Sequence, residues 1–138
     1  MGAWGYDVFE NDTAGDWVYE LEERGADQIA ATLAAVKSVG DGYLDADSAC
    51  EGLAAAETVA RLLGRPGQRD SYTESLDAWI ASNSMTPSTD MITAAIAAVD
   101  RVLGQHSELA ELWGDSADAG TWRASVAGLR RRLTPEAK

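Results

Sequence analysis

Residues 48–63 read Ser-Ala-Cys-Glu-Gly-Leu-Ala-Ala-Ala-Glu-Thr-Val-Ala-Arg-Leu-Leu, and their apolar side chains recur with the period of an α-helix. The alanine-rich body has high helix propensity and allows a neighbouring helix to approach closely. Ser48 and Glu51 form the capping-box pattern of a helix start, and Gly64 followed by Pro66 marks a helix end. These signals predict a helix here, with one apolar face made of Ala49, Leu53, Ala56, Ala60 and Leu63.

The same periodicity extends outward in both directions along the chain. Asn11 or Asp12 can cap the first helix of the chain, which Gly25 ends, and Ser71-x-x-Glu74 is a second capping box. About six further helices are expected, near residues 12–24, 26–38, 71–81, 88–103, 107–113 and 122–133. The side chains expected to face inward in these helices include Trp17, Leu33, Tyr72, Trp79, Ile96, Leu112 and Trp122.

No segment alternates convincingly with a period of two, so strands are not expected. The connections between the helices are short, which favours antiparallel neighbours in a bundle. The sequence therefore predicts an all-α, compact bundle of about six or seven short helices. Its 138 residues form one helical domain over 1–138, with an irregular N-terminal strap at 1–11 and a frayed tail at 134–138.

Composition restricts the location and the partners of the protein. The single cysteine excludes an intramolecular disulfide, and neither a secretory signal nor an apolar run of about 18 residues is present. These features predict a cytoplasmic protein with no membrane association. The formal net charge of −12 argues against nucleic-acid binding. Arg130, Arg131 and Arg132 do not change this prediction, because their side chains fan around a helix end and complement its dipole there.

No motif for a metal or a cofactor is found. Zinc needs several His or Cys ligands, and the chain offers only Cys50 and His106. We expect Cys50 to be a buried helical cysteine and His106 to be solvated or to help cap a helix end. The acidic residues at 7–16 and 41–51 do not match the spacing of an EF-hand and are better explained as helix caps, although weak divalent-cation binding stays open.

The segment before the first helix is unusual. Residues 2–9 contain three aromatic side chains and two glycines. Trp4 and Phe9 either anchor this segment on the bundle or belong to an exposed recognition loop, and we favour the anchor.

Glu57 lies at the edge of the apolar face of its helix, with Arg61 one turn later. The pair is either a surface ion pair or part of a half-buried site in which Glu57 accepts hydrogen bonds from the N-terminal segment. The candidate functional or structural surface is therefore formed by Trp4, Asp7, Glu10, Asn11, Asp12, Glu57 and Arg61. No catalytic, cofactor-binding or metal-ligating residue is assigned.

Several motifs resemble a bacterial family known as domain of unknown function 4259. They are Met1-Gly2-Ala3-Trp4-Gly5, Phe9-Glu10-Asn11-Asp12, Asp16-Trp17, residues 53–60, residues 107–113, Trp122 and residues 129–133. The resemblance spans nearly the whole chain and implies a bacterial, single-domain protein. It implies no activity, cofactor or site residue.

We expect a non-catalytic, acidic protein-interaction module, either an immunity-type or a regulatory binder, whose partner presents a basic surface. The alternative is a ligand-binding protein or an enzyme in which Asp7, Glu10, Asp12 and Glu57 converge in a cleft. A third possibility is a homo-oligomer with tryptophans at its interface, and the sequence does not determine the oligomeric state.

Overall fold

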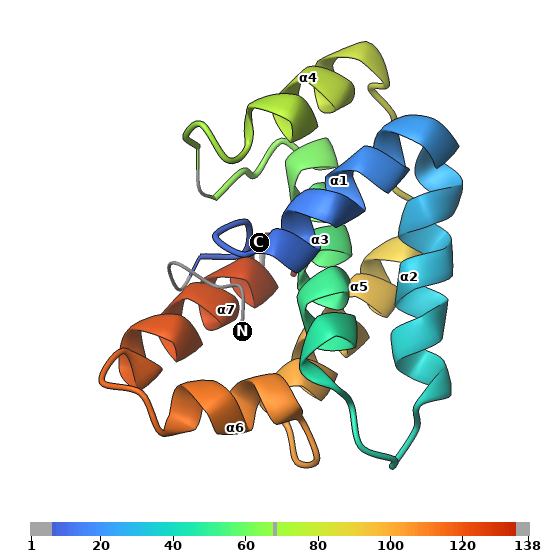
Figure 1. Ribbon diagram of the computed structural model, residues 1–138. Coiled ribbons are helices and arrows are strands. Elements are labelled where there is room, and N and C mark those ends of the chain that lie inside the picture. Colours follow the sequence, from blue (N-terminus) through green and yellow to red (C-terminus); the bar gives the residue numbers. More distant parts are fainter. Residues whose placement is uncertain (1–6, 68, 135–138) are drawn as a thin grey trace.

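The computed structural model describes residues 7–67 and 69–134, and these residues form seven α-helices (Figure 1). In chain order the helices are α1 Asp12–Arg24, α2 Ala26–Ser38, α3 Ala46–Leu62, α4 Glu74–Ser82, α5 Thr89–Leu103, α6 Glu108–Gly114 and α7 Ala119–Leu133. The described part of the chain contains no strand, and Leu44 and Ser107 form an isolated bridge. The predicted all-α, compact fold is confirmed.

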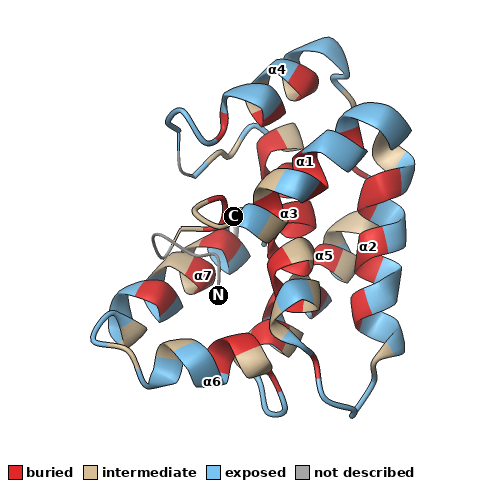
Figure 2. Ribbon diagram, in the orientation of Figure 1, coloured by how far each residue is buried: buried red, intermediate tan, exposed pale blue. Residues whose placement is uncertain are grey.

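Helix α3 lies at the centre of the bundle and packs against each of the other six helices. Figure 2 shows the consequence, since α3 is buried on nearly all of its faces whereas α1 and α2 each keep an exposed face. Every residue from Gly52 to Arg61 is buried. Small side chains permit this packing, because Ala54, Ala55 and Ala56 let neighbouring backbones approach closely on several sides.

Some predicted helix boundaries are confirmed. The side-chain oxygen of Asn11 accepts a hydrogen bond of 2.8 Å from Ala14 N and caps α1, and Gly25 ends this helix with φ of +66°. Ser88 and Ser107 cap α5 and α6. These caps supply acceptors for amide groups that have no partner within their own helix.

The two predicted capping boxes are wrong. Helix α3 begins at Ala46, and its cap is Asp45, which accepts a hydrogen bond of 3.1 Å from Ser48 N. Helix α4 begins at Glu74, after Thr73, and no side chain of the described residues caps it; the Asp70 side chain accepts from Tyr72 N at 2.9 Å in the turn before the helix. At α3 an aspartate upstream of the serine supplies the acceptor, because a short carboxylate is an equally good cap.

Tyr72 and Leu112 are predicted to face the core, but they are 48% and 45% exposed. Tyr72 precedes α4, so the helical period does not determine where it faces. Trp17 is buried as predicted, and its indole N–H donates a hydrogen bond of 2.8 Å to Thr32 on α2. None of the helices in the described residues has the length and apolar character needed to span a membrane.

Candidate functional site

The most unusual group of side chains surrounds Glu57, near the C-terminal end of α3. Its side chain is only 2% exposed because helices cover α3 on all sides. A carboxylate removed from water needs partners that replace its lost hydration. The structure supplies them from two other segments of the chain and from α3 itself.

Arg132 on α7 is the principal partner of Glu57. Its two terminal nitrogens donate hydrogen bonds of 2.8 Å to the two carboxylate oxygens, which is the bidentate geometry of a strong ion pair. The amide of Gly67 donates a further hydrogen bond of 3.2 Å. Arg61 lies one turn along α3, with its Nε 3.4 Å from the same carboxylate.

Arg61 extends the group to α4. It is also only 2% exposed on its side chain, and it donates a hydrogen bond of 2.7 Å to Asp77. The hydroxyl of Thr73 donates to the other oxygen of Asp77 at 3.1 Å. We call Glu57, Arg61, Asp77 and Arg132 the ion network, whose two carboxylates and two guanidinium groups balance.

The loop after α3 is shaped around this network. A Cβ at Gly67 would lie 2.6 Å from the guanidinium of Arg132, so only glycine allows Arg132 to reach Glu57 without a shift of one of the two. Arg65 and Arg132 also bond to each other's backbone, with distances of 3.1 and 3.0 Å to the respective carbonyl oxygens. The loop and the end of α7 are therefore held together.

This arrangement settles the two interpretations of the Glu57–Arg61 pair in part. It is not a surface pair, since both side chains are buried. Within the described residues, the hydrogen bonds to Glu57 come from Gly67 and Arg132 and not from residues 7–11. A carboxylate held by two arginines is suited to joining segments of the fold, and it is poorly suited to exchanging protons with a substrate.

The N-terminal candidates form a separate group. Asp7 accepts a hydrogen bond of 3.3 Å from Ser125 on α7, and the amide of Glu10 donates to the Asp7 carbonyl at 3.0 Å. Burial, and then a hydrogen bond with the Asp7 side chain, raises the pKa of Glu10. Asn11 serves as a cap, Asp12 is exposed in the first turn of α1, and Trp4 lies outside the described residues.

The structure therefore brings Asp7 and Glu10 together, as the alternative function requires. Glu57 is instead engaged by the ion network, and Asp12 points to solvent. The described residues contain no group of three or more His, Cys, Asp or Glu side chains that could hold a metal ion.

Cys50 and His106 are placed as expected. Cys50 is buried, and burial followed by the nearby carboxylates of Asp47, Glu51 and Asp45 raises its pKa to about 12. His106 is exposed in the loop between α5 and α6 and adopts φ of +57°. A thiol this weakly acidic is a structural cysteine and not a nucleophile.

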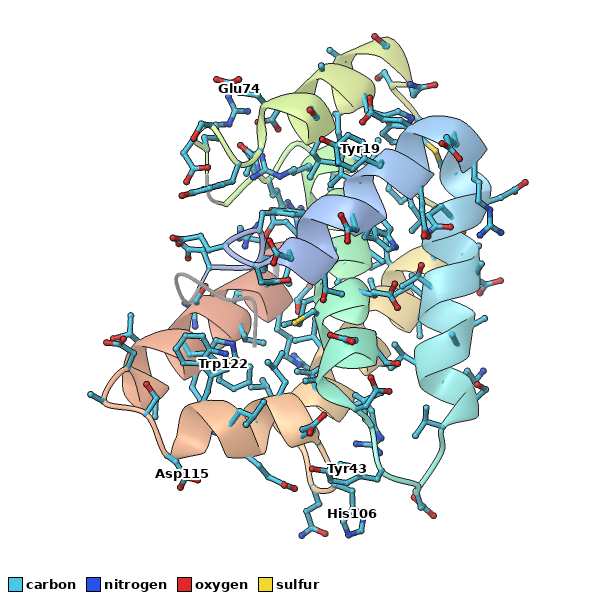
Figure 3. All side chains as sticks on the ribbon, in the orientation of Figure 1. Tyr19, Tyr43, Glu74, His106, Asp115 and Trp122 are labelled. Atoms are coloured by element: carbon cyan, nitrogen blue, oxygen red, sulfur yellow. The ribbon has the colours of Figure 1, made fainter. Side chains whose placement is uncertain are left out.

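A second surface was missed by the sequence analysis. Tyr43 is 55% exposed, and its hydroxyl donates a hydrogen bond of 2.9 Å to Glu111 on α6. Glu108 on the same helix accepts from Ala46 N at 2.8 Å, so α6 is joined to the start of α3. Figure 3 shows Tyr43 at the same end of the molecule as His106. We call Tyr43, Asp45, Asp47, Glu108 and Glu111 the acidic end.

The contacts that assemble the ion network and the acidic end join segments far apart in the chain. Glu57 and Arg132 are separated by 75 residues, and Tyr43 and Glu111 by 68. The pattern of one helix cannot indicate which residue of a distant helix lies beside it. The exposure of Tyr43 likewise becomes known only from the structure.

Comparison with known proteins gives one match. No curated protein and no solved structure matches the chain. The sequence does match a protein family over residues 2–125, which include every member of the ion network except Arg132. The chain therefore belongs to the family described as Domain of unknown function (DUF4259).

Proposed function

We propose that this protein is a non-catalytic binding module, immunity-type or regulatory, that recognises a basic surface of another protein through the acidic end. The observation that carries the proposal is Tyr43, a half-exposed aromatic ring among carboxylates. Aromatic side chains supply much of the binding energy at protein interfaces. A tyrosine beside carboxylates matches an arginine or lysine, which can contact the ring and the negative charge together.

The ring of Tyr43 is held in place before any partner binds. Its hydroxyl is bonded to Glu111, and that hydrogen bond raises the pKa of Tyr43. Leu112 follows Glu111 on α6 and is 45% exposed, so α6 also presents apolar area to solvent. A side chain that is already ordered loses less conformational entropy on binding.

The distribution of charge also favours the acidic end as the binding surface. Asp45 and Asp47 are exposed at the start of α3, and Glu108 and Glu111 belong to the first turn of α6. The chain as a whole carries a net charge of −12. A field of this sign speeds association with a basic protein and makes the association rate fall with added salt.

The test uses site-specific photo-crosslinking in the cells that produce the protein. A photoreactive phenylalanine analogue replaces Tyr43 in one variant and Tyr19 in the control, because Tyr19 is also exposed, at 69%, but lies on α1. We expect a defined crosslinked protein from position 43 only. The affinity of the purified partner is then measured for Tyr43→Ala and for Tyr19→Ala.

Tyr43→Ala should weaken binding by about tenfold or more, which is the range of an interface hot spot, while Tyr19→Ala changes the affinity little. Added salt should slow association of the wild type. A partner with an acidic binding surface, or equal losses for the two tyrosine variants, would contradict the proposal.

A further inference from the structure

A hollow of 420 Å³ lies between the end of α7 and the loop that follows α3. It is lined by Arg65, Gly128, Arg131 and Arg132. Three of these four residues are arginines, in a chain whose formal net charge is −12. The sequence analysis attributed Arg131 and Arg132 to the helix dipole, and their meeting with Arg65 depends on the packing of α7 against α3.

The guanidinium groups of the hollow differ in how far their charge is balanced. Arg132 is paired with Glu57. Arg65 donates through one nitrogen to the carbonyl oxygens of Arg132 and Thr134, at 3.1 Å each, and these acceptors carry no full charge. Throughout residues 7–67 and 69–134, neither Arg65 nor Arg131 has a carboxylate partner. The hollow therefore carries an excess of positive charge.

Two of the three arginines are also fixed in position. The bidentate bond to Glu57 holds Arg132, and the two carbonyl oxygens at the end of α7 hold Arg65. The neighbouring Arg130 turns away and pairs with Asp100 at 2.6 Å, so it does not contribute to the hollow. Ordered guanidinium groups bind an anion with less loss of conformational entropy than free ones.

Gly128 keeps the hollow open. A Cβ at this position would lie 3.7 Å from Arg131, which is ordinary contact, so a side chain could be accommodated there by the backbone. Glycine in a helix interior is less stable than alanine by about 1 kcal/mol. Position 128 therefore leaves the space beside the arginines free of a side chain, although alanine there would make the helix more stable.

We propose that this hollow binds a small phosphate-class oxyanion, with Arg65 and Arg131 as its main ligands and Arg132 as the third side of the site. The guanidinium groups of Arg65 and Arg131, beside that of Arg132, match an anion with more than one charge and several acceptor oxygens. This site is independent of the acidic end, since it recognises a ligand of opposite charge with different residues.

The experiment measures binding of pyrophosphate to the full-length protein by calorimetry and by NMR of the arginine Nε–H groups, at constant ionic strength. The wild type should bind saturably and shift the signals of the three arginines. Arg131→Gln should weaken binding by about tenfold, the loss expected for one charged hydrogen bond. Arg123→Gln is the matched control, because Arg123 is exposed on the same helix but does not line the hollow.

Gly128→Met provides a variant that leaves every arginine in place. It fills the hollow and raises the helix propensity of α7, so the protein should stay folded while binding is weakened. Absence of saturable binding below about 10 mM would overturn the proposal, because the affinity would then be too weak for a specific site. Equal losses in Arg123→Gln and Arg131→Gln would also overturn it, since the effect would then be one of net charge.

Discussion

The charged side chains at one end of α3 are buried, whereas those at the other end are exposed. At the C-terminal end, the side chains of Glu57 and Arg61 are each only 2% exposed and belong to the ion network. At the N-terminal end, Asp45 and Asp47 are exposed, and they accept hydrogen bonds from Ser48 and Thr13. Both ends belong to one helix of 17 residues.

The difference shows what burial demands of a charge. An exposed carboxylate keeps its water, so one hydrogen bond is sufficient and an excess of negative charge is tolerated. A buried carboxylate loses its water and must be balanced by cations in good geometry. The net charge of −12 is therefore compatible with a balanced interior, because the excess can lie on exposed surfaces such as the acidic end.

The largest expected effect comes from breaking the buried end. Glu57→Gln keeps the size of the side chain but leaves Arg132, and in part Arg61, without the charge that balances them. Removing one member of a buried ion pair costs about 3–5 kcal/mol, and we expect a loss of this size in the free energy of unfolding. Urea denaturation measures it.

Glu23→Gln is the control for this change, because Glu23 is an exposed glutamate on α1. It should alter the free energy of unfolding by less than about 0.5 kcal/mol. If Glu57→Gln cost no more than the control, the ion network would not hold the fold together.

The reactivity of the Cys50 thiol measures burial in the N-terminal part of α3. Its pKa of about 12 leaves so little thiolate at pH 8 that alkylation by iodoacetamide should be about a thousandfold slower than for an ordinary cysteine. Mass spectrometry follows the reaction over time. In urea the same thiol should react at the ordinary rate, and equal rates in the two states would show that Cys50 is accessible in the folded protein.

The smallest effect is expected at the exposed end. Asp45→Ala removes the cap of α3 and should cost about 1 kcal/mol. Hydrogen bonds from the Ser48 side chain and amide lower the pKa of Asp45. The stability that the Asp45 carboxylate contributes is therefore fully present above its pKa in the unfolded chain, about 3.9. It is lost as the pH falls through the lower pKa that Asp45 has in the folded protein.

Denaturation at several pH values checks this prediction. The difference in stability between wild type and Asp45→Ala should shrink as the pH falls below about 4. Ser48→Ala is the matched variant, because it removes only the hydroxyl that bonds to Asp45 at 2.7 Å. A difference that stays constant down to pH 2 would mean that the Asp45 carboxylate is not the group responsible.

The comparison of the two ends also shows how far local patterns lead. All seven helices follow from periodicity and from residues such as Asn11, Gly25 and Ser88, whose preferences act within a few residues of the chain. The capping boxes at Ser48 and Ser71 are wrong because α3 begins earlier, with Asp45 as its cap, and α4 begins later, after Thr73. Local signals of similar strength cannot be ranked without the backbone geometry.

The candidate site was predicted less completely. Glu57 and Arg61 were identified from their place on the helix, but their environment was not, because it depends on Asp77 and Arg132. Asp7 and Glu10 are close in the chain, and their proximity could be expected. Tyr43 gave no signal, since its hydrogen bond is to Glu111 on α6, far away in the chain.

The sequence by itself determined that this chain is helical, where its helices lie, and that its charge is strongly negative, because these properties depend on composition and on neighbours within a few residues. Only the tertiary structure decided that α3 is covered on all sides, that Glu57 meets Arg132 and that three arginines share one hollow. The physical reason is that burial and charge pairing are set by residues far apart in the chain, which the packing of helices alone brings together.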